Sequence, residues 1–61
     1  MIWKPISELV TPDVKRQILC RWDGLNEPLY EVLTIWPDGV LTDRDEDELH
    51  EGLPDQYCEI S

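Results

Sequence analysis

Carboxylates are the residues of this sequence whose number and spacing most clearly suggest a chemistry. Nine of the fourteen Asp and Glu residues lie in residues 38–61, and four of them are contiguous at residues 45–48. Only one base, Arg44, lies in the same stretch, so residues 38–61 carry a formal charge of −8 and residues 1–37, with five acids and four bases, carry −1. Like charges repel and destabilise a compact chain, so this concentration needs an explanation.

Two explanations of the acidic stretch are open. A net charge far from zero keeps a small protein dispersed, and acid runs commonly form a solvated face. Alternatively, carboxylates at strand spacing (about 6.6 Å) or helix spacing (about 5–6 Å) imitate a row of phosphates and bind a basic partner. The candidate partner-binding residues are Asp43, Asp45, Glu46, Asp47, Glu48, Glu51, Asp55 and Glu59.

The net charge of −9 limits the class of partner. Direct binding of nucleic acid relies on Lys and Arg that neutralise phosphates, and binding to anionic membranes needs the same residues. We therefore expect no direct contact with nucleic acid or membrane. The predicted partner is a basic protein whose surface normally binds nucleic acid.

The acids do not match a metal site or a catalytic pair. Asp43, Asp45 and Asp47 occur at every second position, as the first ligands of an EF-hand calcium loop do. Such a loop also needs Gly at its sixth position and Glu at its twelfth. Those positions are Glu48 and Pro54 here. An acid–base pair needs one carboxyl with a pKa raised by burial, whereas consecutive acids beside a turn are expected to be solvated.

The thiols and the histidine show no functional spacing either. Cys20, Cys58 and His50 lack the close Cys-x-x-Cys or His-x-x-x-His pairs of a four-ligand zinc site. A Cys–His nucleophile would need a supporting shell that so short a chain cannot provide. We expect two free thiols, no metal, no cofactor and no enzymatic activity.

Length bounds the fold to one small acidic domain over residues 1–61. Such a chain buries only about 60% of the surface that its unfolded form exposes, so large apolar side chains must supply most of the stability. The core candidates are Trp3, Trp22, Trp36, Ile18, Leu33, Ile35 and Tyr57.

Two long apolar segments are predicted to form strands. Residues 14–22 fit either an amphipathic helix or a strand, and the turn signal at residues 23–24 favours a strand from about residue 16. Residues 29–36 are rich in aromatic and branched residues, with both faces largely apolar, as in a central strand. The turn Pro37-Asp38-Gly39 then leads into a return strand at residues 40–42.

Helical structure is expected to be brief. Pro5 can open one turn with Ile6, Leu9 and Val10 on a shared face. Residues 42–51 are expected to form at most one or two frayed turns, because like charges fall at helical spacing. Leu49 and Leu53 are predicted to anchor this segment to the core. With a final strand at 56–60, we predict an α+β domain with a three- or four-stranded antiparallel meander and one or two short helical turns.

Several motifs resemble a group of short phage and prophage proteins of unknown function, which typically open with Trp-x-Pro-x-Ser-Glu. The matching segments are Trp3-x-Pro5-Ile6-Ser7-Glu8, Pro12-Asp13, Trp22-Asp23-Gly24, Trp36-Pro37-Asp38-Gly39 and Tyr57-Cys58-Glu59-Ile60. The chain departs from that group at Thr11 and at Asp55-Gln56. The resemblance implies a small meandering sheet and an origin in a mobile element. In size and acidity the chain is also similar to the small anti-CRISPR proteins of phages.

These observations predict a non-enzymatic inhibitor that presents its acids to the nucleic-acid groove of a host protein, with a CRISPR surveillance complex as the expected target. The alternative is a small phage structural or adaptor module that acts by dimerisation or strand addition. A monomer and a homodimer both remain open. The first five residues lack the basic start and apolar run of a signal peptide, so we expect the bacterial host cytoplasm.

Overall fold

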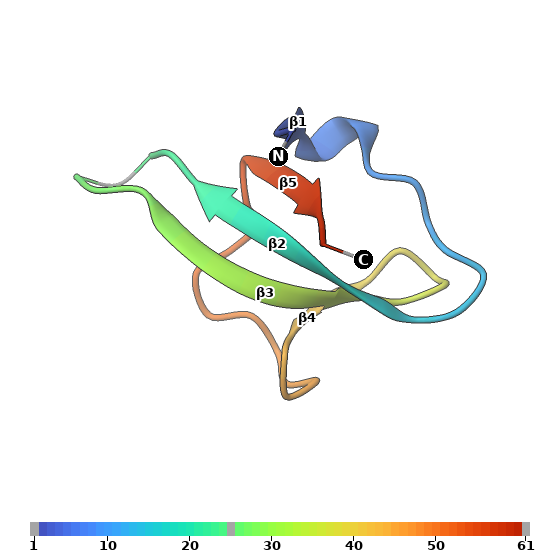
Figure 1. The fold of residues 1–61 in the computed structure, drawn as a ribbon. Helices are drawn as coiled ribbons and strands as arrows, with labels where there is room; N and C mark the ends of the chain where they lie inside the picture. Colours follow the sequence, from blue (N-terminus) through green and yellow to red (C-terminus); the bar gives the residue numbers. More distant parts are fainter. Residues whose placement is uncertain (1, 25, 61) are drawn as a thin grey trace.

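The computed structural model describes residues 2–24 and 26–60, which form one antiparallel sheet of five strands (Figure 1). The elements in chain order are β1 (Lys4–Pro5), the 3₁₀ helix η1 (Ile6–Glu8), β2 (Arg16–Trp22), β3 (Leu29–Ile35), β4 (Leu41–Asp43) and β5 (Gln56–Glu59). Across the sheet the strands lie in the order β1-β5-β2-β3-β4. Among the described residues, no helix has the length and apolarity that crossing a bilayer requires.

The strand order is that of a Greek key rather than of the predicted meander. β2, β3 and β4 follow one another across the sheet, but β5 pairs with β2 on the far side from β4. The chain between β4 and β5 crosses the sheet to make this return (Figure 1), and Leu49 within it packs against the core. The two-residue β1 then pairs with β5, which raises the strand count to five.

In the central pair β2–β3, the side chains alternate between the two faces of the sheet. Ile18 lies opposite Leu33, Cys20 opposite Glu31, and Trp22 opposite Leu29. Paired residues in an antiparallel sheet share a face, so these residues define a core face. Leu19, Arg21, Tyr30 and Val32 alternate with them and define the second face of the sheet.

The core lies on the core face and includes only one of the three tryptophans. The buried residues packed together there are Ile18, Cys20, Trp22, Leu33, Ile35 and Tyr57, and Ile6, Leu9, Leu29, Leu41 and Leu49 pack around them. The Trp22 indole N–H donates to the Gly52 carbonyl at 3.2 Å, which ties the β4–β5 connection to this face.

The prediction that Trp3 and Trp36 are core residues is wrong, because both are half-buried. The Trp36 indole N–H donates to the Thr42 hydroxyl at 2.8 Å, across the β3–β4 hairpin. Trp3 lies against Tyr30, with ring centroids 5.8 Å apart. Alternation places Tyr30 and Thr34 on the second face, where Tyr30 is exposed and Thr34 is buried.

Helix is scarcer than an α+β domain requires. The single described helix is the three-residue η1, which starts directly after Pro5 as expected, and Ile6 and Leu9 pack against the core while Val10 is 72% exposed. The acidic segment contains no helical turn among its described residues. Of the two leucines predicted to anchor this segment to the core, Leu49 packs against it, whereas Leu53 is 73% exposed.

A candidate acidic interaction surface

The acidic loop, residues 43–51, is ordered by the side chain of its first residue. Asp43 ends β4, and its Oδ1 accepts hydrogen bonds from the backbone N–H groups of Asp45 (2.8 Å) and Asp47 (2.9 Å). The Asp43 N–H donates to the Asp47 carbonyl, and the Glu46 N–H donates to the Asp43 carbonyl, both at 2.9 Å. Asp43 is half-buried and therefore shapes the loop more than it presents a charge.

Glu46 has a left-handed backbone and an ion pair within the chain. Its φ is 69°, the one positive φ of a non-glycine residue in the described chain. Its carboxylate pairs with the Lys15 ammonium, which also lies 5.0 Å from the centre of the Trp36 ring. Lys15 thus links the loop to the β3–β4 hairpin and neutralises one of the predicted site residues.

Four acids of the loop remain for contact with another molecule. Asp45, Asp47, Glu48 and Glu51 are all exposed. Within residues 2–24 and 26–60, none of their carboxylates forms a hydrogen bond or an ion pair. The loop therefore presents four carboxylates without a partner among the described residues, and the Asp43 hydrogen bonds hold its backbone between residues 43 and 47.

Asp55 and Glu59 differ from these four acids because their carboxylates have partners within the chain. Asp55 precedes β5, and its carboxylate accepts the Asp23 N–H at 2.6 Å. Glu59 ends β5 and pairs with Arg16 at 2.7 Å. Of the eight predicted residues, four therefore have carboxylates engaged within the chain, namely Asp43, Glu46, Asp55 and Glu59.

Ion pairs within the chain reduce the positive charge that is available to offset the loop acids. Of the five bases, Lys15, Arg16 and Arg21 pair with Glu46, Glu59 and Asp23. Arg21 also lies near two aromatic rings, with its guanidinium 5.9 Å from the Trp3 centre and 5.7 Å from the Tyr30 centre. Few cations are left to offset the four free loop acids.

A hollow of about 470 Å³ lies beside the acidic loop and was not predicted from the sequence. Leu19, Tyr30 and Val32 line it from the second face, and Glu31, Asp43, Arg44 and Asp45 complete its rim. Glu31 and Asp43 belong to the core face by register, so the hollow lies around the free edge of β3. The sequence feature that could have indicated this hollow is the unequal length of the two paired strands, because β3 is longer than β4.

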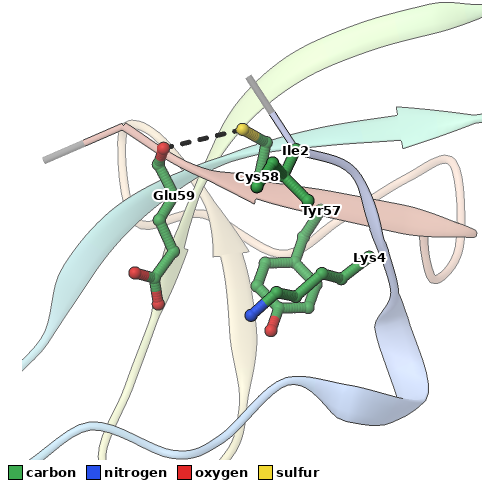
Figure 2. Close-up of a pocket in the computed structure, with 5 residues that line it drawn as sticks. All are labelled: Ile2, Lys4, Tyr57, Cys58 and Glu59. Carbon is green, nitrogen blue, oxygen red and sulfur yellow. Dashed lines mark hydrogen bonds between the residues drawn. The ribbon is translucent and has the colours of Figure 1, made fainter.

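A second hollow, of about 370 Å³, lies at the β1–β5 side of the sheet (Figure 2). Ile2, Lys4, Tyr57, Cys58 and Glu59 line it, and the Tyr57 ring and the Cys58 thiol point to opposite sides of β5. The Cys58 thiol lies 3.6 Å from the carbonyl of Glu59. No histidine is among these lining residues, so the hollow does not assemble a Cys–His nucleophile.

The two cysteines lie on opposite faces of the sheet. Cys20 lies opposite Tyr57 on the core face, whereas Cys58 follows Tyr57 and points the other way. They therefore cannot form a disulfide with each other. Burial raises the pKa of the Cys20 thiol to about 12, because the interior disfavours the thiolate. Cys20 is thus an inert core residue at neutral pH.

In the described part of the chain, no three side chains of His, Cys, Asp or Glu are grouped so as to hold a metal ion. No family model, curated protein or solved structure matches this chain. The acidic surface is therefore interpreted from its own geometry.

Proposed function

We propose that the protein is a non-enzymatic inhibitor that presents its acidic loop to the nucleic-acid groove of a host protein and so blocks DNA binding. The observation that carries this proposal is the exposure of Asp45, Asp47, Glu48 and Glu51, with no partner among the described side chains. Similarity in size and acidity to phage anti-CRISPR proteins makes a CRISPR surveillance complex in the bacterial cytoplasm the first target to test.

The mechanism follows from electrostatics. A surface with a formal charge of −9 is attracted to a basic groove over several ångströms, which raises the association rate at low salt. Partner arginines then bind the carboxylates through short, bidentate hydrogen bonds. The Asp43 hydrogen bonds lower the entropy cost of binding, because residues 43–47 of the loop are already held together.

Two variants of equal net charge test the proposal. The loop variant D45N/D47N/E48Q and the control variant E8Q/D13N/E27Q each neutralise three exposed acids, changing the formal charge from −9 to −6. We expect only the loop variant to lose affinity for a purified surveillance complex and to stop competing with DNA. Affinity is measured at about 0.05 and 0.2 M salt, a range over which phosphate-like contacts weaken steeply.

The outcomes separate the two explanations of the acids. If the charges act only as a solubilising face, both variants keep full affinity and competition. If overall charge matters but its position does not, both variants weaken equally. Wild-type protein that fails to displace DNA from the complex refutes DNA mimicry at that target, however acidic the surface is.

The second candidate function is a structural adaptor that works by dimerisation or strand addition. The observation that favours it is the uneven length of β3 and β4, which leaves one side of residues 29–32 without a strand partner in the described chain. Main-chain pairing depends little on salt, so an adaptor should keep its affinity as salt rises, whereas an electrostatic inhibitor should lose it.

A further inference from the structure

We propose that the free edge of β3 binds an extended basic segment of a partner protein as an added strand. The inference deepens the proposed function and rests on it, because the same acidic surroundings select a basic partner. β4 pairs with β3 only over residues 33–35, where Leu33 lies opposite Asp43. Beyond that point, residues 29–32 of β3 have no strand partner on this side within the described chain.

The backbone groups that face the free edge follow from the hairpin. The Trp36 N–H donates to the Val40 carbonyl at 3.0 Å, so the backbone N–H and C=O groups of residue 36 point toward β4. Backbone groups alternate sides along an antiparallel strand, so residues 34, 32 and 30 point the same way. Thr34 lies opposite Thr42, whereas Val32 and Tyr30 lie beyond the end of β4. Their N–H and C=O groups are therefore available to an incoming strand.

The hollow beside β3 lies where such a strand would lie. Tyr30 and Val32 line it from the second face, and Glu31 lines it from the core face. The hollow therefore extends around the edge of β3 and is not confined to one face of the sheet. Leu19 extends its apolar floor across the neighbouring strand. Strand addition gains affinity from main-chain hydrogen bonds and gains specificity from pockets for alternate side chains.

The surroundings of the edge select the side chains of the occupant. On the second face, Leu19 and Val32 offer apolar contacts to every other residue of an added strand. On the core-face side, Glu31 lies next to the edge, and the rim carries the acid Asp45 beside the one base, Arg44. An added strand presents alternate residues to these two environments. The matching segment therefore alternates apolar residues with Lys or Arg.

Charge also argues against a second copy of this chain as the occupant. Two copies meeting at β3 would bring together two molecules with a formal charge of −9 each. Acids beside a free edge are a common device against edge-to-edge pairing of identical chains. A basic segment removes that repulsion and turns the same acids into contacts.

The test uses two peptides of roughly six residues, the usual length of a strand. One alternates Lys and Val, and the other has the same composition in two blocks. We expect the alternating peptide to bind more tightly and to slow amide exchange at Tyr30 and Val32 by about tenfold when present at ten times its Kd. Equal binding of the two peptides, or exchange unchanged at both residues, would overturn the proposal.

Substitutions at the edge give a second readout. Val32→Pro removes the edge N–H without breaking a bond inside the sheet, and Val32→Thr keeps both the N–H and the branched shape. We expect at least tenfold weaker peptide binding for V32P and little change for V32T. If V32P does not fold, exchange in the wild-type protein decides the question. Dimers of the wild-type protein that dissociate in V32P would assign the edge to a second copy and overturn the proposal.

The results also distinguish this inference from the proposed function. If the loop variant loses the surveillance complex while V32P keeps it and neither peptide binds, the inhibitor proposal stands and the added strand is refuted. If the alternating peptide binds at β3 while the wild-type protein never displaces DNA, the added strand stands and DNA mimicry is refuted.

Discussion

Glu46 shows how a single residue carries both a backbone cost and a charge contact. Its left-handed φ of 69° costs an L-residue about 1–2 kcal/mol, whereas glycine adopts this conformation freely. We expect E46G to be more stable than E46A by about 1 kcal/mol, because both variants lose the Lys15 pair and only E46A keeps the strained Cβ. Urea unfolding compares the two variants, and an E46A that is equally stable would show that the loop relaxes around residue 46.

Cys20 predicts an alkaline limit to stability. Its pKa is about 12 in the folded protein and 9.0 in an unperturbed thiol, so below pH 9 both states hold the proton and this thiol adds no pH dependence. Between pH 9 and 12 only the unfolded state loses its proton, so the free energy of unfolding falls by about 1.4 kcal/mol per pH unit from this group. We expect C20A to be less stable at pH 7 but to show a shallower decline above pH 9 in denaturant titrations. The same slope in both proteins would assign the decline to other groups.

At the scale of elements, we expect the acidic loop to depend on a hydrogen-bond acceptor at residue 43 and not on the charge of that residue. Asp43 Oδ1 accepts two backbone N–H groups, and Asn offers the same oxygen without the charge. We expect D43A to lose about 1–2 kcal/mol, as for a helix-capping side chain, and D43N to lose much less. Melting temperatures and amide exchange at residues 45 and 47 check this. Equal losses in D43A and D43N would show that the charge matters instead.

The whole molecule should be stabilised by salt. Its extents are 34 × 25 × 18 Å, and the Debye length is about 30 Å at 0.01 M but about 8 Å at 0.15 M. At low salt the excess acids therefore repel one another across the entire protein. We expect the melting temperature to rise with sodium chloride over this range, and to rise less for the loop variant D45N/D47N/E48Q. A melting temperature that falls with salt would mean that the ion pairs of Lys15, Arg16 and Arg21 outweigh the repulsion.

The sequence by itself determined the local elements of this protein. Strands at Arg16–Trp22 and Leu29–Ile35, the turn with Gly39 at φ 89°, and the burial of Ile18, Leu33, Ile35 and Tyr57 follow from side-chain alternation and turn chemistry, which act between near neighbours. The concentration of charge in residues 38–61 is likewise a property of composition.

Tertiary structure alone decided which of these features meet. The return of β5 to β2 placed Glu59 beside Arg16, and alternation within each strand does not specify which strand becomes its neighbour. Trp36 is as apolar as Trp22, yet the core face has room only for the residue whose side chain points into it. The end of β4 at Asp43 left Tyr30 and Val32 at a free edge beside acids, because pairing length is set by contacts between distant segments and not by the propensity of either strand.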